Sequence, residues 1–442
     1  MEGDVQRTKR YDSVAYEQSL KYKGKIQTLP KVPITSLQDF SVWYTPGVAE
    51  VSRRIKDNTD LSFELTGRWN SVAIVTDGTR VLGLGNVGPE AAMPVMEGKA
   101  LIFNYLGGIN AIPLPLRASG RDEFIATVKA LEPSFGAFNL EDIESPKCFF
   151  VLQALQKSME VPVWHDDQLG TASITLAGLL NALKVVGKKR EDVTVTLIGS
   201  GAANVAIANL LIAAGFRAGN MYLVDHMGIL QPERADMDKL MLENPLKYDL
   251  AMKTNAKRKK DGIEAAMKGA DIVISASKSE AGFIHKEWVQ EMNDDGIVFA
   301  LANPVPEIWP KDAKDAGAKV VATGRSDFPN QINNSLVFPS LFRGVLDARA
   351  KGVNFEVMIA ASEEIARFIE EPEPDRIVPT MDQWEMYPTV AATVAYKTVE
   401  LGLARRQHSR EWFLENATEI IDANRRIYSS LLKTGLIKKM EG

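Results

Sequence analysis

Two pairs of adjacent acidic residues point most directly to chemistry in this 442-residue sequence. One pair is Glu141-Asp142, and the other is Asp166-Asp167, which follows Trp164 and His165. Both pairs adjoin apolar stretches, and carboxylates are seldom buried unless something pairs with them. Oxygen ligands favour a hard divalent ion, so the pairs indicate a shared Mg²⁺ or Mn²⁺ site. Acidic pairs also occur as solvated loop ends, and that alternative stays open for each pair alone.

A glycine-rich turn follows the second acidic pair. The β-branched run 193–198 predicts a buried strand, Gly199 and Gly201 predict a tight turn, and residues 202–214 predict a helix. Residues 221–224 predict another strand. Strand, glycine turn, helix and strand follow one another here as they do in a dinucleotide-binding βαβ unit.

The residues around this turn support that interpretation only in part. The N–H groups at the helix start, at Ala202 and Ala203, would hold a pyrophosphate. Asp225 ends the second predicted strand, 24 residues after Gly201, where an acid binds ribose hydroxyls. Asn204 stands where the pattern expects a third glycine. A G-x-G motif alone is weak evidence for a dinucleotide site, so the hypothesis depends on the two predicted strands and on Asp225.

Three further motifs carry chemical content. Tyr44 precedes a Thr-Pro-Gly turn, although a half-buried core tyrosine would look the same. Lys99 lies inside an apolar helix. Burial there would lower the pKa of its amine into the range where it can act as a base. The alternative is a lysine at the helix surface. Asn303 and Asn334 follow predicted strands, at the edge where open α/β sheets bind ligands, but loop asparagines are usually turn formers.

Composition bounds the function. Hydrophobic residues make up 45% and charged residues 25%, and the net charge is -5 with a pI near 5.7. This balance argues against nucleic-acid and anionic-membrane surfaces, and we expect no apolar run near the ~18 residues that span a bilayer. The single Cys148 excludes a disulfide framework, so we expect a cytoplasmic location.

Alternating strands and helices predict an α/β protein with parallel sheets. We expect a first unit over 1–160, a dinucleotide-binding unit over 161–387 and a helical segment over 388–442. The expected strands are 72–76, 81–84, 111–116, 137–140, 193–198, 221–224, 272–275, 297–301 and 319–323. The expected helices are 11–21, 89–107, 121–131, 170–186, 202–214 and most of 388–434.

Taken together, these motifs closely resemble the malic enzyme family in its short bacterial and archaeal form. The matching strings occur in family order over roughly residues 40 to 345. They include Tyr44-Thr-Pro-Gly-Val, Pro94-Val-Met-Glu-Gly-Lys99, His165-Asp-Asp-Gln and Phe299-Ala-Leu-Ala-Asn-Pro304. The departures are Leu169, where bacterial members often have histidine, and the absent third glycine. The resemblance implies an N-terminal α/β substrate domain, a Rossmann-like doubly wound dinucleotide-binding domain and a helical C-terminus.

The resemblance implies oxidative decarboxylation of L-malate to pyruvate and CO₂ with reduction of NAD(P). Oxaloacetate decarboxylation is a further expected activity. Lys99 would take the hydroxyl proton of malate, and Tyr44 would protonate enolpyruvate. A metal ion would bind Glu141, Asp142 and Asp167, with Asp166 orienting the site from behind. The residues expected to hold substrate are Arg80, Asn303 and Asn334, and Asn303 would also contact the cofactor.

The cofactor predicted from the sequence is NAD, with NADP as the alternative. Asp225 would attract the ribose hydroxyls of NAD and repel a 2′-phosphate. His226 could partly neutralise that phosphate when protonated, and Arg234 is the only nearby arginine that could fold back. Relatives are dimers or tetramers, so we expect a homodimer or a higher homo-oligomer, and the N-terminal helix could cross between subunits.

Two rival functions remain at this stage. The nearer one is malolactic chemistry, which uses the same parts, retains the cofactor and releases lactate. The other is a non-catalytic dinucleotide-binding sensor, which predicts loss of at least one proton-transfer or metal residue, whereas this sequence keeps all of them. An amino-acid dehydrogenase would share the sheet and a catalytic lysine but has no use for the paired acids.

Overall fold

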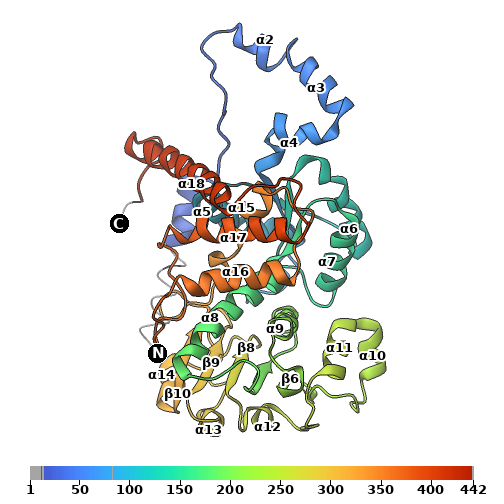
Figure 1. Cartoon of the computed structure of the whole chain (residues 1–442), viewed down its shortest axis with the longest axis vertical. Coiled ribbons are helices and arrows are strands. Elements are labelled where there is room, and N and C mark those ends of the chain that lie inside the picture. The colour runs from blue at the N-terminus through green and yellow to red at the C-terminus, as the bar shows by residue number, and fades with distance from the viewer. Residues whose placement is uncertain (1–10, 12–13, 82, 441–442) are drawn as a thin grey trace.

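The computed structural model describes residue 11 and residues 14–81 and 83–440, which form two largely parallel sheets (Figure 1). The first sheet has four parallel strands in the order β2-β1-β3-β4. Their bounds are β1 (Ser71–Thr76), β2 (Asn110–Pro115), β3 (Ala137–Leu140) and β4 (Val163–His165). Strand β4 lies beyond residue 160, so this sheet extends past the boundary expected for the first unit.

The second sheet has six strands in the order β10-β9-β8-β5-β6-β7, and only β7 runs antiparallel to its neighbour. Their bounds are β5 (Val195–Ile198), β6 (Met221–Asp225), β7 (Gly228–Ile229), β8 (Ile272–Ser275), β9 (Gly296–Ala300) and β10 (Ala318–Thr323). The order reverses at β5, which has β6 on one side and β8 on the other. A doubly wound sheet of this kind binds its ligand at such a switch point.

Helices cover both sheets and connect them. Helices α17, α16 and α8 are stacked through the middle of the molecule, and α8 also packs against α9 (Figure 1). Helix α15 packs against both α17 and α5, so the C-terminal helices return to the first sheet. The bounds of these helices are α5 (Gly88–Gly107), α8 (Thr171–Val186), α9 (Ala202–Ala213), α15 (Phe338–Asp347), α16 (Phe355–Arg367), α17 (Met386–Glu400) and α18 (Arg410–Lys433).

Further helical elements pack around these. They are α4 (Ser62–Leu65), α6 (Arg121–Ala130), α7 (Lys147–Ser158), α10 (Met237–Glu243), α11 (Pro245–Lys253), α12 (Ile263–Met267), α13 (Lys286–Gln290) and α14 (Pro310–Asp315). Five 3₁₀ turns cover η1 (Thr59–Leu61), η2 (Gly67–Asn70), η3 (Glu132–Ser134), η5 (Ala218–Asn220) and η6 (Asn334–Leu336). One π-helical turn, η4 (Asp166–Gly170), leads directly into α8.

An arm near the N-terminus stands apart from this packed body. Helices α2 (Asp39–Trp43) and α3 (Val48–Asp57) contain no buried residue, and Figure 1 shows them projecting from one end of the molecule. At the root of the arm, Glu64 accepts two hydrogen bonds from the guanidinium of Arg406, at 2.6 and 2.7 Å. The arm is therefore fastened at its base, while its own apolar side chains remain exposed.

Two expectations from the sequence are wrong. Residues 83 and 84 form a turn, and Val81 pairs with Gly85 as an isolated bridge, because Gly85 at φ +77° reverses the chain; residue 82 lies outside the described part. One stretch, 166–186, does have the length and apolar composition of a membrane span, with mean hydropathy 1.5. Because 67% of that window is buried inside the protein, we interpret it as a core helix. The other predicted strands and helices are present with ends shifted by a few residues, except that the predicted helix 11–21 includes residues outside the described part.

Candidate active site

A buried lysine between two carboxylates forms the centre of the site. The Nζ atom of Lys99 lies 2.7 Å from Oε1 of Glu141 and 2.5 Å from Oδ2 of Asp166. Lys99 is only 9% exposed, and the two acids are buried as well. The same ammonium lies 4.5 Å from the centroid of the Phe338 ring, which forms an apolar wall. Charges buried this deeply persist because they pair with one another.

The parallel sheet explains why these groups meet. Strands β3 and β4 are neighbours, so their carboxyl ends bring the two acidic pairs to one edge. The backbone N–H of Asp142 donates to Oδ2 of Asp167 at 2.9 Å, which joins the pairs directly. Lys99 reaches the same edge from α5. The structure therefore brings Lys99 and all four acids together at this edge, and their roles remain predictions.

The pKa of Lys99 does not behave as the sequence predicted. Burial lowers the pKa of this amine, but the charges and hydrogen bonds of Asp166 and Glu141 outweigh burial and raise the pKa above its ordinary value. The expectation of a lowered pKa is therefore wrong for this arrangement. Burial in turn raises the pKa of both Glu141 and Asp166, although Lys99 opposes that shift. The centre holds one ammonium among several carboxylates.

The residues fit a divalent cation in chemistry and in place. The negative charges of Asp167, Asp166 and Asp142 all raise the pKa of Glu141 further, so the edge has an excess of negative charge that a cation would offset. As the side chains stand, no three Asp, Glu, His or Cys residues in the described part of the chain are arranged to hold an ion. Glu141 and Asp166 turn toward Lys99 instead.

Asp166 and Asp167 differ in their surroundings. Asp166 is fully buried, and its Oδ1 accepts a hydrogen bond from Nε1 of Trp164 at 2.9 Å while its Oδ2 binds Lys99. The Asp167 side chain is 38% exposed and is turned toward Asp142. This contrast agrees with a supporting role for Asp166 and a ligand role for Asp167, and both roles remain predictions.

Two residues expected to bind substrate lie beside this centre. The backbone N–H of Arg80 donates to the carbonyl of Asp142 at 3.0 Å, which holds its loop over the acids. Asn334 begins η6 and approaches Gly170 so closely that a Cβ there would meet Asn334 Cβ at 3.1 Å. The structure therefore places both residues at the site, and their roles remain predictions.

Tyr44 does not reach the centre within one chain. It follows α2 on the projecting arm and is 69% exposed, and the helices on either side of it bury nothing. The structure therefore does not bring Tyr44 to Lys99 within one chain, and the role of Tyr44 as proton donor remains a prediction. Sequence reasoning missed this because a motif fixes the local turn and says nothing about which surface the turn faces.

A second, larger cavity opens at the carboxyl edge of the second sheet. Its volume is about 1270 Å³, and its lining includes Gly199, Gly201 and Asp225. Gly199 has φ +92°, and a Cβ there would lie 2.9 Å from the carbonyl of Ala276, so only glycine fits the turn. Helix α9 starts at Ala202, followed by Ala203, so its free N–H groups border this turn. The cavity has the place and shape of a dinucleotide site.

Asn204 explains the missing third glycine. Its side chain is fully buried, and its Nδ2 donates to the carbonyls of Ile198 and Gly199 at 2.8 and 2.9 Å. The Asn204 amide, on α9, thus holds the backbone of the glycine turn in place through two hydrogen bonds. The incomplete glycine pattern reflects a different way of holding the same turn.

Asp225 lies between two cations. Arg234 donates to both of its carboxylate oxygens, at 3.0 and 3.1 Å, and Nζ of Lys247 lies 2.5 Å from Oδ2. Burial raises the pKa of Asp225, but the bonds from Lys247 and Arg234 outweigh it and hold the pKa below its usual value. Lys247 also lines the cavity. Sequence reasoning missed Lys247 because α11 brings it back across the chain.

Comparison with known proteins agrees with this geometry. Residues 23–121 match the malic enzyme N-terminal domain, and residues 169–400 match the malic enzyme NAD-binding domain. A Bacillus subtilis protein named bifunctional malic/malolactic enzyme is 46% identical over 87% of this chain and 92% of its own. A Geobacillus stearothermophilus NAD-dependent malic enzyme is 44% identical over 87% of this chain and 79% of its own. The chain belongs to the malic enzyme family.

Solved structures of the family share the whole fold. A malic enzyme from Pyrococcus horikoshii superposes with a TM-score of 0.91 at 42% identity, over 95% of this chain and 99% of that one. An Entamoeba histolytica malic enzyme superposes with a TM-score of 0.96 at 40% identity, over 100% and 93%. The expected pair of an α/β domain and a Rossmann-like domain is confirmed.

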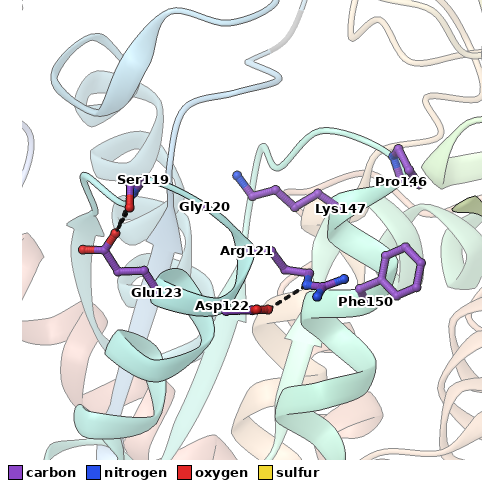
Figure 2. Close-up of a pocket in the computed structure, with 8 residues that line it drawn as sticks. All are labelled: Ser119, Gly120, Arg121, Asp122, Glu123, Pro146, Lys147 and Phe150. Carbon is purple, nitrogen blue, oxygen red and sulfur yellow. Dashed lines mark hydrogen bonds and ion pairs between the residues drawn. The ribbon is translucent and has the colours of Figure 1, made fainter.

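A smaller hollow of about 500 Å³ lies between the starts of α6 and α7 (Figure 2). Its charged groups are paired among themselves or with neighbours: Arg121 with Asp122, Glu123 with Ser119, and Lys147 with Asp77. Asp77 directly follows β1, so Lys147 connects this hollow to the loop that carries Arg80. The ion pair of Lys147 with Asp77 therefore supports the loop that carries Arg80, and none of the paired residues of the hollow indicates a ligand.

We predict that Gly170→Ala destabilises the protein by about 2 kcal/mol or more, the upper range for overpacking a buried site. A Cβ at this position would lie 2.0 Å from Oδ1 of Asp166 and would push it away from Trp164 and Lys99. Urea unfolding of both variants measures this. Gly98→Ala in α5 is the control, because its Cβ would meet nothing within 4 Å. Equal stability of the two variants would contradict the tight packing around Asp166.

Proposed function

We propose that this protein oxidatively decarboxylates L-malate to pyruvate and CO₂ while reducing NAD(P). The observation that carries the proposal is the buried Lys99, held by Glu141 and Asp166. This centre lies next to the dinucleotide cavity, because the π-helical turn η4 packs against α9. A proton-transfer group and a hydride acceptor would thus flank one substrate.

The residues support a proton route for the oxidation step. Hydride leaves C2 of malate for the nicotinamide, and the C2 hydroxyl loses a proton. Lys99 holds a proton in this arrangement, and its Nζ lies 2.5 Å from Oδ2 of Asp166. We infer that Lys99 passes a proton to Asp166 and accepts the hydroxyl proton in return. Burial of Asp166, which raises its pKa, suits it to receive that proton.

Substrate carboxylates would be held at the rim of the centre. Arg80 is exposed on the loop above Asp142, and a guanidinium binds a carboxylate with two parallel hydrogen bonds. Asn334 and Asn303 would donate amide hydrogens from the side of the second sheet. Loss of CO₂ from the β-ketoacid then leaves enolpyruvate, whose C3 needs a proton from Tyr44.

We propose that Glu141, Asp142 and Asp167 hold Mg²⁺ or Mn²⁺. When bound, such an ion polarises the C2 oxygen and stabilises negative charge there after CO₂ leaves. The excess of carboxylates at this edge and the partial exposure of Asp167 support this assignment. Asp166 would keep its bonds to Trp164 and Lys99 and so orient the site without binding the ion.

A steady-state assay tests the function and the metal together. We predict NADH or NADPH formation from L-malate with Mg²⁺ or Mn²⁺, loss of turnover in EDTA, and recovery when the metal is restored. A Lys99→Ala variant should lose ~10²–10⁴-fold in rate, as is typical for removal of a positioned acid or base. Full activity in EDTA would rule out the metal assignment, and near-normal turnover of Lys99→Ala would rule out the proton route.

The second candidate function is malolactic decarboxylation. The name of the Bacillus subtilis relative, a bifunctional malic/malolactic enzyme, is the observation that favours it. The same assay separates the two, because malolactic turnover yields lactate without net accumulation of reduced cofactor. Lactate as the main product would replace the function proposed here.

For the cofactor, we propose that NAD is preferred and that NADP is also accepted. Asp225 can bind the ribose hydroxyls of NAD. The positive charge of Lys247 offsets the repulsion between Asp225 and a 2′-phosphate. Arg234 contributes less to this, because it pairs with both Asp225 and Asp236. Lys247 lines the cavity, so a 2′-phosphate could draw it away from Asp225.

We predict that Lys247→Ser lowers kcat/KM for NADP by about tenfold or more and changes that for NAD much less, since only NADP presents a 2′-phosphate. Lys253→Ser on the same helix is the control, because Lys253 is exposed and pairs with Asp249. Initial rates with both cofactors give the ratio. An unchanged NADP/NAD ratio in Lys247→Ser would show that this lysine does not select the cofactor.

Finally, we propose a homodimer in which the arm of each chain delivers Tyr44 to the site of its partner. The arm exposes five apolar side chains besides Tyr44: Leu37, Phe40, Val42, Trp43 and Val48. A patch of this kind on a monomer indicates a covering partner. A second copy of the chain would cover the patch and complete the proton route.

Mixed dimers test this arrangement. We predict that a dimer of one Lys99→Ala chain and one Tyr44→Phe chain regains about half the wild-type activity, since one of its two sites then has both native residues. Each parent homodimer is the control and should remain nearly inactive. A mixed dimer as inactive as its parents would show that Tyr44 serves its own chain.

A further inference from the structure

Glu307 is a fully buried carboxylate that the proposed reaction does not use. Its exposed fraction is 0%, and it lies shortly after β9 in the loop that contains Asn303. Its Oε1 accepts hydrogen bonds from the Ser275 hydroxyl at 2.7 Å and from the Ser277 N–H at 2.9 Å. Its Oε2 accepts the N–H of Ala302 at 3.1 Å. One side chain therefore joins the loops that follow β8 and β9.

Burying a carboxylate here is costly, which makes its presence informative. Burial raises the pKa of Glu307, and the three hydrogen bonds oppose that rise. Those three donors are neutral hydroxyl and amide groups. A carboxylate surrounded by neutral donors contributes little net stability compared with an uncharged residue. What it does provide is a fixed distance between two loops, because both of its oxygens are engaged.

The two loops border the site from the side of the dinucleotide. Ser277 lines the large cavity. Asn303, one residue after Ala302, is held in a narrow space. A Cβ on Gly324 would meet its Nδ2 at 2.4 Å, and a Cβ on Gly83 would meet its carbonyl oxygen at 3.2 Å. Gly83 belongs to the loop that carries Arg80, so Asn303 lies where the two halves of the site meet.

We propose that Glu307 is a positioning residue that sets Asn303 at the junction of substrate and nicotinamide. The bond from Ala302 fixes the chain just before Asn303, and the bonds from Ser275 and Ser277 tie that point to the floor of the cofactor cavity. Glu307 acts through Asn303 and touches no reactant. This inference rests on the proposed function, in which Asn303 contacts both malate and the cofactor.

Glu307→Gln is the informative substitution, because it keeps the shape of the side chain. The amide oxygen can still accept the hydrogen bonds of Ser275 and Ser277. Its NH₂ group would face the N–H of Ala302, donor against donor, so only the link to Asn303 is released. We expect kcat for malate oxidation to fall about tenfold or more, because a small misplacement of reacting groups lowers the rate by this order or more. Binding of NADH, followed by fluorescence, should change less than threefold.

A double-mutant cycle separates positioning from general stability. If Glu307 acts through Asn303, then Glu307→Gln should have no further effect, within about twofold in kcat, in an Asn303→Ala background. Glu287→Gln is the matched control, because Glu287 is an exposed acid of the same domain, and it should leave kcat and the melting temperature unchanged. Melting curves of all variants exclude unfolding as the cause.

The outcomes distinguish this inference from the proposed function. A normal kcat in Asn303→Ala would refute the role of Asn303 and with it the basis of the inference. A defective Asn303→Ala combined with a normal Glu307→Gln would overturn the inference alone. Additive losses in the double variant would also overturn it, because they would show that Glu307 acts independently of Asn303.

Discussion

The charge balance around Lys99 is the constraint on which the rest of the site depends. An ammonium and two carboxylates that are all buried can persist only at close range, since each would otherwise lose its hydration without compensation. That requirement explains the architecture around them. Strands β3 and β4 must be parallel neighbours, and α5 must bring Lys99 to the acids that follow them. Trp164 and Asn139, which donate to Asp166 and Glu141, hold the carboxylates at the required angles.

Much of the fold could be predicted because its signals are local. Strands β1, β5 and β8 are runs rich in β-branched residues and buried along almost their whole length, which is the pattern of a parallel sheet. Residues 81–84 misled because three apolar residues beside glycines resemble a short strand, whereas Gly85 with its positive φ reverses the chain there. The apolar stretch 166–186 shows the reverse limit: composition alone cannot tell a core helix from a membrane span, and only its packing against α9 and α16 does.

The same contrast between local signals and long-range contacts applies to the residues of the candidate site. The paired acids were predictable because each pair adjoins an apolar stretch, and Lys99 was predictable because it lies inside an apolar helix. Tyr44 has an equally clear motif, but whether its turn faces its own chain or another depends on a surface that no local pattern encodes. Lys247 and Glu307 were missed because their partners, Asp225 and Ser275, lie far away in the sequence and are brought to them only by the fold. Asn204 was noticed only as a defect, although it replaces a glycine with a pair of hydrogen bonds.

The pKa of Lys99 shows why burial by itself does not make a base. Burial lowers the pKa of the Lys99 amine, but the charges and hydrogen bonds of Asp166 and Glu141 together outweigh burial and raise it. The deciding quantity is therefore the net charge of the centre, which is one ammonium against Glu141 and Asp166, with Asp142 and Asp167 nearby. A cation added beside the acids would lower the pKa of Lys99, because it offsets their negative charge. Removing one of the acids would also lower this pKa, but it would disrupt the packing that buries Lys99. Asp142 and Asp167 are thus the acids beside which positive charge can be added while Lys99 keeps Glu141 and Asp166 as its partners.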